Sequence, residues 1–408
     1  MLKLCQVRSF LLRPSYQICP AVRSYSIKKE QNTPLTLALR DKIKRSGTIS
    51  VAEYMNEALT DSLHGYYTKG DMFGVEGDFT TSPEVSQMFG ELIGIWFVNQ
   101  WQNSGKPANI QIIEYGPGRG TLLDDMLRAM ASFKDFFGSL KNVHLIEVSP
   151  ALRKLQHEKL CGGKSSGASS SFEFAGPKFH WHDSIRNIPG VWSMIIAHEF
   201  FDALPVHQFK KTKDGWREIM VDIDESDQST YHFQLVTSST STTASNVYTS
   251  APEYERMSVG DTIEISPLSW NNANEIAKYI HDYGGSALII DYGKDHLQGD
   301  TLRAVKKHRF TSILTTPGEV DLTADVDFAY LKSAAAGLVN THGPIRQRDF
   351  LEKFGIQLRL SMLLKNTPKS NHRILISEYE RLTSPLLMGS VYKFMCMVPL
   401  RSQLPFPF

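Results

Sequence analysis

A glycine-rich turn after a short apolar run is the feature of the sequence most suited to chemistry. Residues 110–113 are largely apolar and lead into Glu114, and Gly116, Gly118 and Gly120 follow at alternate positions. Glycine at a strand-to-helix turn permits a positive φ and lets a ligand approach the backbone, while the first N–H groups of the next helix lack internal partners. The pattern predicts a cofactor site. A tight turn that binds nothing is the alternative, since a short motif is only a hypothesis.

The spacing of the glycines distinguishes between two classes of cofactor. A dinucleotide fingerprint reads GxGxxG, whereas here the third glycine comes one residue early and Thr121 occupies the final position. Glu114 would repel a pyrophosphate, but it suits the cationic methionine portion of S-adenosyl-L-methionine. We therefore expect S-adenosyl-L-methionine as the cofactor, with NAD and an oxidoreductase function as an alternative.

Two further acids follow predicted strands. Glu147 ends the apolar run that begins at Val143, and Asp183 ends a run over 179–183. Ligands of open parallel sheets bind at the carboxyl ends of the strands, so these acids and Glu114 are expected at one edge. We expect Glu147 to accept both ribose hydroxyls of a nucleoside and Asp183 to meet the adenine amino group. A solvated strand-end acid is the ordinary alternative for Glu147.

The segment HEFFDALP, residues 198–205, follows another apolar run and supplies two carboxylates. It is not the zinc-protease motif HExxH, because Asp202 stands where the second histidine would be, and no metal is expected. Two acids can instead grip a planar guanidinium in bidentate fashion. We therefore predict Glu199 and Asp202 as catalytic residues that hold a nitrogen in line with the methyl group. For Asp202, capping of the following turn is an equal alternative.

Helical segments separate the strand-like runs, which is the pattern of an α/β fold with a doubly wound, mostly parallel sheet. A further run over 286–293 closes with Asp291 and Tyr292 at the same expected edge. Before this run, about 206–270 form an insertion with the alternation typical of β-hairpins. Two late runs, at 372–380 and 391–399, also have strand character.

The N-terminal third predicts helices around a long loop. Apolar spacing predicts two helices within 33–63 and a third from Pro83 to about Asn103. Between them, residues 64–83 are dense in glycine, aspartate, threonine and tyrosine, which is turn chemistry over a length too great for a simple connector. A loop of this length predicts a functional role.

Composition excludes several classes of protein. The chain has 408 residues, of which 41% are hydrophobic and 11% aromatic, so most of it is not disordered. Its 44 basic residues against 43 acidic ones give no support for nucleic-acid binding. Four scattered cysteines are too few for a disulfide framework, and no apolar run is long enough to span a bilayer.

The first residues have the composition of a mitochondrial presequence. Residues 1–29 contain six basic residues and no acid, with serines and scattered apolar residues. We expect residues 1–25 to be removed by cleavage after Tyr25 or a little later; a basic tail without targeting function is the alternative. Without residues 1–25, 40 basic and 43 acidic residues remain, a formal charge of −3 that suits a cationic cofactor and an arginine-bearing partner.

Seven segments of the chain resemble the family of mitochondrial complex I assembly methyltransferases and their bacterial relatives, often called the MidA family. The segments are GYYTKGDMFGVEGDFTTSPEVSQMFGELIGIW (65–96), EYGPGRGTLLDDML (114–127), HEFFDALPVHQF (198–209), ALIIDYG (287–293), GDTLRAVKKHRF (299–310), PGEVDLTADVDF (317–328) and the stretch at 343–351. The resemblance implies a Rossmann-like class I methyltransferase with a seven-stranded sheet. It divides the chain into N-terminal helices and a cofactor lid over 33–108, and a methyltransferase domain over 109–408.

The resemblance also implies site residues and a substrate. The loop and the helix after it become a cofactor lid, with further candidates Gly74, Asp78, Thr81, Ser82 and Glu84. Tyr67 and Phe79 of the loop, and Asp321, Thr323 and Asp327 of 317–328, are weaker candidates. The implied activity is symmetric ω-dimethylation of an arginine in a core subunit of respiratory complex I, in the mitochondrial matrix. A non-catalytic assembly chaperone that binds S-adenosyl-L-methionine is the alternative, and a homodimer is left open.

Overall fold

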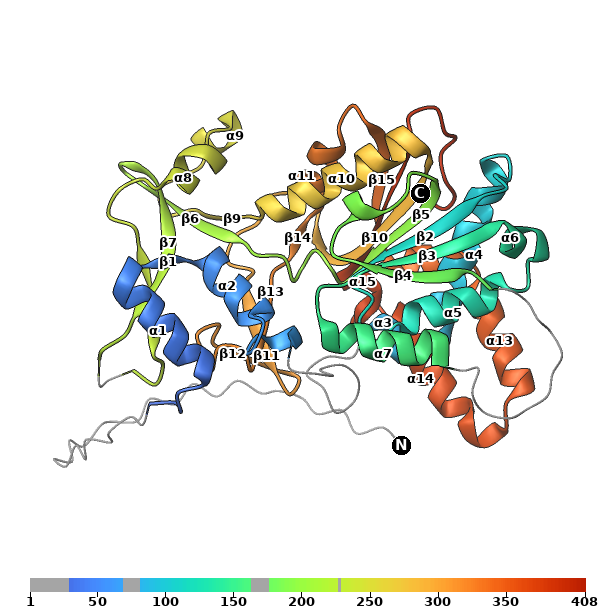
Figure 1. Ribbon diagram of the computed structural model, residues 1–408, viewed down its shortest axis with the longest axis horizontal. Helices are drawn as coiled ribbons and strands as arrows, with labels where there is room; N and C mark the ends of the chain where they lie inside the picture. Colours follow the sequence, from blue (N-terminus) through green and yellow to red (C-terminus); the bar gives the residue numbers. More distant parts are fainter. Residues whose placement is uncertain (1–28, 69–80, 163–175, 227–228) are drawn as a thin grey trace, which may run out of the picture.

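A twisted central sheet forms the larger part of the molecule (Figure 1). The computed structural model describes residues 29–68, 81–162, 176–226 and 229–408. The expected presequence, 1–25, lies outside the described residues. The sheet has the strand order β15-β16-β10-β5-β2-β3-β4, with β14 (Val326–Asp327) paired to the end of β10. The seven strands are β2 (Ile110–Tyr115), β3 (Leu140–Ile146), β4 (Lys178–His182), β5 (Trp192–His198), β10 (Gly285–Lys294), β15 (Val339–Arg346) and β16 (Tyr392–Pro399).

The strands β10, β5, β2, β3 and β4 are parallel, and β16 runs antiparallel to both β10 and β15. Helices cover both faces, so consecutive side chains of a strand enter different cores: Ile112 packs with α4 and α5, whereas Ile113 packs with α10 and α11. This explains why β2 is buried at every position. The predicted doubly wound, mostly parallel sheet is confirmed. Its helices are α4 (Gln87–Asn103), α5 (Thr121–Met130), α6 (Lys134–Ser139), α7 (Pro150–Cys161), α10 (Pro267–Tyr283) and α11 (Phe328–Ala335).

A second module lies beside the sheet, on the left in Figure 1. Its larger sheet has the order β1-β7-β6-β9, with β8 also paired to β7, and its smaller sheet the order β12-β11-β13. The strands are β1 (Ile49–Ser50), β6 (His207–Thr212), β7 (Gly215–Ile223), β8 (Phe233–Thr237), β9 (Thr262–Ile265), β11 (Arg303–Lys306), β12 (Arg309–Thr311) and β13 (Asp321–Thr323). Short helices α8 (Thr243–Tyr248) and α9 (Pro252–Glu255) lie between β8 and β9.

The two N-terminal helices, α1 (Pro34–Ser46) and α2 (Val51–Thr60), pack on this module and not on the central sheet. Leu39 and Met55 share a core with Val221 of β7 and Leu322 of β13. Helix α4, in contrast, belongs to the core of the central sheet. The segment 33–108, expected as one unit, is therefore divided between two cores, and the N-terminal helices pack on the insertion at 206–270 together with residues 304–324.

Two element predictions differ from the structure. Residues 372–380, predicted as a strand, belong to the helix α14 (His372–Thr383), because Tyr379 and Leu382 at helical spacing pack toward the main core. The helix predicted from Pro83 to Asn103 is broken at Ser86, whose extended backbone separates α3 (Ser82–Val85) from α4 and whose hydroxyl caps α4.

The remaining elements complete the C-terminal half and the loops. They are α12 (Gln347–Lys353), α13 (Ile356–Asn366), α15 (Met388–Val391), and the 3₁₀ turns η1 (Tyr66–Thr68), η3 (Ile185–Asn187) and η4 (Lys369–Asn371). Helices α13 and α14 lie near each other at the lower right of Figure 1. Across the described part of the chain, every helix is too short or too polar to cross a lipid bilayer.

Candidate active site

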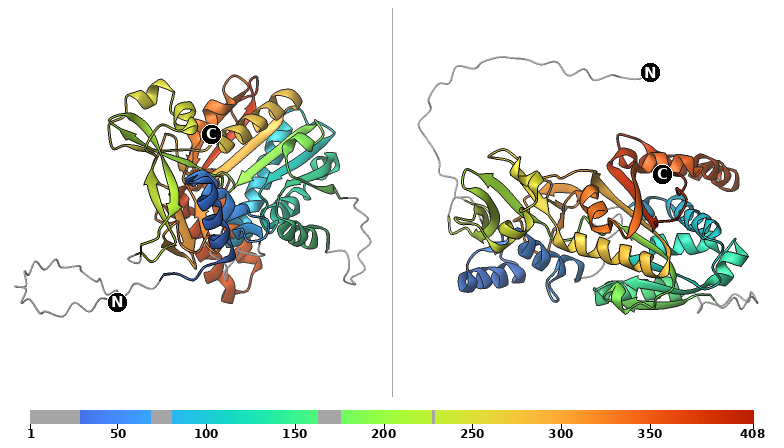
Figure 2. Two further views of the ribbon diagram at one scale, coloured as in Figure 1. Left: turned by 60° about the vertical axis from the view of Figure 1, so that its left-hand side comes forward. Right: turned by 90° about the horizontal axis from the view of Figure 1, so that it is seen from above.

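A cavity of about 730 Å³ lies at the carboxyl ends of β2, β3, β4 and β5, between the central sheet and the second module. Figure 2 shows the second module beside this end of the sheet. Nine of the main candidates and two of the weaker ones line the cavity: Thr81, Glu84, Glu114, Gly116, Gly118, Glu147, Asp183, Glu199 and Asp202, with Tyr67 and Asp321. Ser82 and Gly120 are not among its lining residues, and Gly74 and Asp78 lie outside the described residues.

The glycine-rich turn has the backbone that its sequence predicts. Gly116, Gly118 and Gly120 have φ angles of 56°, 53° and 79°, which other L-residues rarely adopt. A Cβ atom on Gly116 would lie 3.1 Å from Cδ2 of Phe200. Gly120 is the N-cap of α5 and faces Leu160, so it shapes the turn from behind the cavity.

Glu114 is a buried carboxylate at the end of β2. Its Oε2 atom has no hydrogen-bond partner among the described residues, although the side chain lines the cavity. Burial raises the pKa of this carboxyl to about 8. A buried carboxylate with one unpaired oxygen favours a cationic ligand, and the cationic methionine portion of S-adenosyl-L-methionine fits that requirement.

Glu147 is held by a network that sequence reasoning did not find. Its Oε1 accepts the Ser149 backbone N–H at 2.8 Å, and its Oε2 accepts Nε2 of Gln156 at 3.2 Å. Gln156, on α7, also donates to the Gly118 carbonyl at 2.8 Å and accepts the Trp181 indole N–H at 2.9 Å. The buried amide therefore connects the glycine-rich turn, Glu147 and β4, and it fixes the orientation of the carboxylate.

Asp183 has a different environment. Its side chain is 77% exposed and forms an ion pair with Arg153, whose Nε also donates to the Glu147 carbonyl. The carboxylate therefore lies at the solvated rim of the cavity. A contact with an exocyclic amine stays a prediction.

The start of α3 contacts the glycine-rich turn. Glu84 accepts the hydroxyl of Thr121 at 2.7 Å and lies 3.6 Å from Nη1 of Arg119, so it supports the turn from the opposite side. The Ser82 hydroxyl, in contrast, is buried against Oε1 of Gln347 at 3.4 Å. Its side chain therefore has a packing role, whereas its neighbours Thr81, Pro83 and Glu84 line the cavity.

Glu199 follows β5 in a backbone conformation that is uncommon for a residue with a side chain, with φ of 48°. Its Oε1 lacks a hydrogen-bond partner among the described residues and lies 3.4 Å from Nε2 of His198. Burial and the nearby Asp202 raise the pKa of Glu199 to about 8, while hydrogen bonds from Tyr392 and the Ser82 backbone oppose that shift. Burial lowers the pKa of His198 to about 3, so this imidazole is neutral and cannot compensate the acid.

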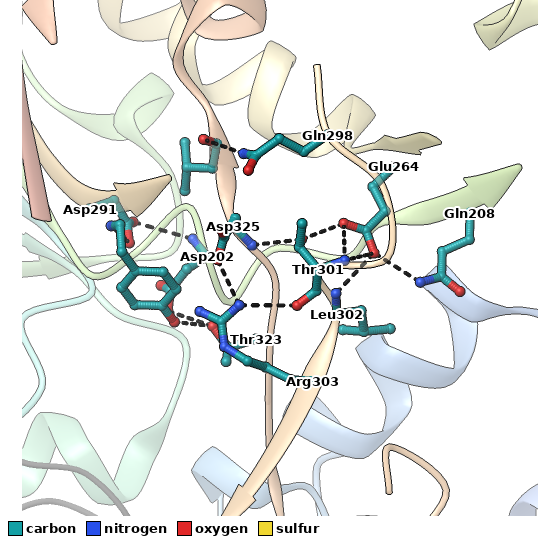
Figure 3. A network of polar contacts seen from close by, with 12 residues as sticks. Asp202, Gln208, Glu264, Asp291, Gln298, Thr301, Leu302, Arg303, Thr323 and Asp325 are labelled. Atoms are coloured by element: carbon teal, nitrogen blue, oxygen red, sulfur yellow. Dashed lines mark hydrogen bonds and ion pairs between the residues drawn. The ribbon is translucent and has the colours of Figure 1, made fainter. Parts of the chain in front are cut away.

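Asp202 is partly engaged by the protein itself. Its Oδ2 accepts the Tyr292 hydroxyl and the Thr323 hydroxyl, the latter at 2.7 Å, while Oδ1 has no hydrogen-bond partner in the described part of the chain. Burial raises the pKa of Asp202. Figure 3 shows Asp202 and Thr323, with Asp291 nearby. The buried carboxylate of Asp291 accepts the backbone N–H groups of Phe201 and Asp202 at 3.1 and 3.3 Å, so Asp291 anchors the turn.

The second module contributes to the same cavity. Asp321 of β13 and Tyr67 of η1 both line it, and the Tyr67 hydroxyl donates to Oδ1 of Asp321 at 3.0 Å. Asp327, another candidate, caps α11 by accepting the Tyr330 N–H and is not among the lining residues. Four acids therefore gather on this side of the cavity: Glu199, Asp202, Asp291 and Asp321. Such a cluster favours a cationic group.

The sequence matches known proteins over most of its length. Residues 92–345 match the family described as "Putative S-adenosyl-L-methionine-dependent methyltransferase". The Danio rerio protein named "Protein arginine methyltransferase NDUFAF7, mitochondrial" is 41% identical, with 89% of this chain and 86% of that protein covered. The Homo sapiens protein of the same name is 40% identical, with 90% and 84% covered.

The fold also matches a crystal structure from Burkholderia thailandensis, of a protein bound to S-adenosyl-homocysteine. The TM-score is 0.72 at 23% identity, and the match covers 91% of this chain and 95% of that chain. The family match identifies the cofactor as S-adenosyl-L-methionine, which the buried carboxylate of Glu114 and the oriented carboxylate of Glu147 fit. The chain belongs to the family of S-adenosyl-L-methionine-dependent methyltransferases.

Proposed function

We propose that this chain is a protein arginine methyltransferase of the mitochondrial matrix. Its substrate is an arginine in a core subunit of respiratory complex I, and its product is the symmetric ω-dimethylated side chain formed during assembly. The observation that carries the choice of arginine is the acid cluster beside the cofactor cavity. Glu199 and Asp202 each keep one buried carboxylate oxygen without a hydrogen-bond partner among the described residues, and a planar guanidinium offers matching pairs of N–H donors.

The relatives support the rest of the proposal. Proteins about 40% identical over most of the chain carry names that state arginine methylation and a mitochondrial location. The basic, acid-free segment 1–25 supports import into the matrix. The finer points, namely symmetric dimethylation and the complex I subunit, come from the resemblance of the sequence motifs to the complex I assembly methyltransferases.

The residues of the chain have distinct tasks in this reaction. Glu147 and the glycine-rich turn hold the nucleoside, and Glu114 faces the cationic end of the cofactor. When bound, S-adenosyl-L-methionine supplies the methyl group as an activated sulfonium. Glu199 and Asp202 accept the guanidinium N–H groups and orient the lone pair of the attacking ω-nitrogen. In its ionised form, beside the bound guanidinium, the Glu199 carboxylate can also take the proton that this nitrogen loses, because burial and Asp202 raise its pKa.

A non-catalytic assembly chaperone that binds the same cofactor is the second candidate. Mass spectrometry of complex I core-subunit arginines separates the two functions, in cells that express the wild type, Gly118→Val or Glu199→Gln. We expect symmetric dimethylarginine only with the wild type. Complex I assembly that both variants support without any arginine methylation would favour the chaperone. Calorimetry with S-adenosyl-L-methionine and NAD in parallel tests the cofactor, and tight binding of NAD alone would contradict the proposal.

A further inference from the structure

Arg303 lies directly behind the acid cluster. Its guanidinium carbon is 4.8 Å from the centroid of the Tyr292 ring, and the hydroxyl of that ring donates to Asp202. Nη1 of Arg303 pairs with Asp325 at 2.6 Å and donates to the Thr301 carbonyl at 3.0 Å. Figure 3 shows Arg303 beside Thr323 and Asp325. A cation over the face of a tyrosine is attracted to the ring and restricts its orientation.

The turn before Arg303 is fixed to the insertion sheet by one buried acid. Glu264 of β9 accepts the backbone N–H groups of Thr301 and Leu302, at 3.1 and 2.9 Å, together with the Thr301 hydroxyl. It also accepts Nε2 of Gln208 at 2.8 Å. Glu264 therefore connects the strands β6 and β9 to the turn that places Arg303 (Figure 3).

The surroundings of Asp202 explain why a cation is needed there. Three acids face Asp202 or its turn: Glu199, Asp291 and Asp321. The other polar groups around this cluster are uncharged, namely the hydroxyls of Tyr67, Tyr292, Tyr392 and Thr323 and the neutral imidazole of His198. Burial raises the pKa of Asp202, and the positive charge of Arg303 lowers it. Without that charge the pKa of Asp202 would be raised further.

We propose that Arg303 is a positioning residue for the substrate arginine. By fixing the Tyr292 ring, whose hydroxyl donates to Oδ2 of Asp202, it orients this carboxylate so that Oδ1 can accept a guanidinium N–H. The insertion sheet takes part in the site through Glu264, which places the turn. This role rests on the proposed arginine specificity. The insertion at 206–270 therefore contributes to substrate binding, although it lies far from the glycine-rich turn in the sequence.

The test measures peptide binding by the full-length protein saturated with S-adenosyl-homocysteine. Calorimetry compares an arginine peptide with the same peptide carrying citrulline, between pH 6 and 9, for the wild type, Arg303→Met and Arg303→Lys. Arg309→Met is the matched control, because Arg309 is an exposed arginine on the neighbouring strand β12. Glu264→Gln, which keeps the shape of the side chain, tests the anchor and serves if Arg303→Met does not fold.

We expect the wild type to bind arginine more tightly than citrulline. Arg303→Met should bind the arginine peptide about tenfold more weakly at pH 7. The pH below which affinity falls should rise by about one unit, the smallest shift expected when a carboxyl loses a nearby opposite charge. Arg303→Lys should restore most of this affinity, Glu264→Gln should lose about threefold in the same direction, and Arg309→Met should match the wild type. Affinity for S-adenosyl-homocysteine should stay within about twofold throughout.

The outcomes separate this role from the proposed function. If the wild type shows no preference for arginine over citrulline, the arginine specificity is wrong and this role with it. If the preference exists but survives Arg303→Met with an unchanged pH profile, only the role of Arg303 is overturned. An equal loss for both peptides at every pH would show a merely structural role and would also overturn it.

Discussion

Replacing Gln156 with leucine tests whether the Glu147 carboxylate depends on its helical neighbour. The Gln156 side chain is fully buried and has hydrogen bonds to Gly118, Glu147 and Trp181. Leucine would leave the partly buried Gly118 carbonyl and Trp181 N–H without these partners, and each such group costs up to about 1–3 kcal/mol. The apolar burial of leucine offsets part of this cost, so we expect the free energy of unfolding to fall by about 2–4 kcal/mol.

The effect on the cofactor is smaller and has a separate cause. Glu147 keeps the Ser149 N–H but loses the amide that orients its second oxygen. The loss of one hydrogen bond to a charged group, about 1.5 kcal/mol, predicts about tenfold weaker binding of S-adenosyl-homocysteine. Thermal unfolding and calorimetry measure the two effects. Gln102→Leu, on the exposed surface of α4, is the control and should change neither.

A double-mutant cycle with Glu147→Gln decides whether the two residues act together. If Gln156 acts through Glu147, the double variant should lose less binding free energy than the sum of the two single losses, by at least about 0.5 kcal/mol. Two results would refute the reasoning: wild-type affinity in a destabilised Gln156→Leu, or strict additivity of the two losses. The first would show that Ser149 alone orients the carboxylate.

Three further predictions follow from single contacts. Gly116→Ala should destabilise the protein by about 1–2 kcal/mol in urea unfolding, because φ is positive and the new Cβ would lie 3.1 Å from Phe200; unchanged stability would show that the turn relaxes. Ser82→Ala should leave affinity for the cofactor within about twofold in calorimetry, because its hydroxyl faces Gln347; a larger loss would place it at the site. Burial raises the pKa of Glu114 from 4.5 to about 8, so between these pH values the folded cofactor-free protein binds more protons than the unfolded chain and loses stability as pH rises. Glu114→Gln should make stability less dependent on pH, as measured by thermal unfolding between pH 5.5 and 8.5. An unchanged dependence would contradict the assignment.

The sheet and the line of strand-end acids were predictable because both depend on local patterns. Glu114, Glu147 and Glu199 each follow an apolar run directly, and parallel strands bring such positions to one edge. The glycines of the turn were predictable for the same reason, since a positive φ is required within a few residues of the strand end.

The supporting residues could not be predicted, because they come from distant segments. Gln156 is a polar residue on a helix, and no local signal distinguishes it from a solvated one. Tyr392 and Arg303 reach the acid cluster from β16 and β11, long after Glu199 in the chain. The packing of α1 and α2 on the insertion depends likewise on contacts across more than 150 residues.

The wrong prediction at 372–380 has a physical reason. The run contains Ile374, Leu375 and Ile376 in succession, which a short window does not distinguish from a buried strand. In the structure the helix α14 leaves Ile374 and Ile376 exposed and directs Tyr379 and Leu382 inward. Periodicity over the whole helix, and not the apolar cluster, determines the outcome.

Methyl transfer to a defined peptide tests the central claim most directly. Purified protein, labelled S-adenosyl-L-methionine and one peptide in three forms, with arginine, lysine or citrulline at the same position, give the acceptor specificity in a single assay. We expect label on arginine alone, as symmetric dimethylarginine by mass spectrometry, and at least a hundredfold slower transfer by Glu199→Gln at unchanged cofactor affinity. Transfer to lysine at an equal rate, or full activity of Glu199→Gln, would contradict the assignment of the acid cluster to an arginine substrate.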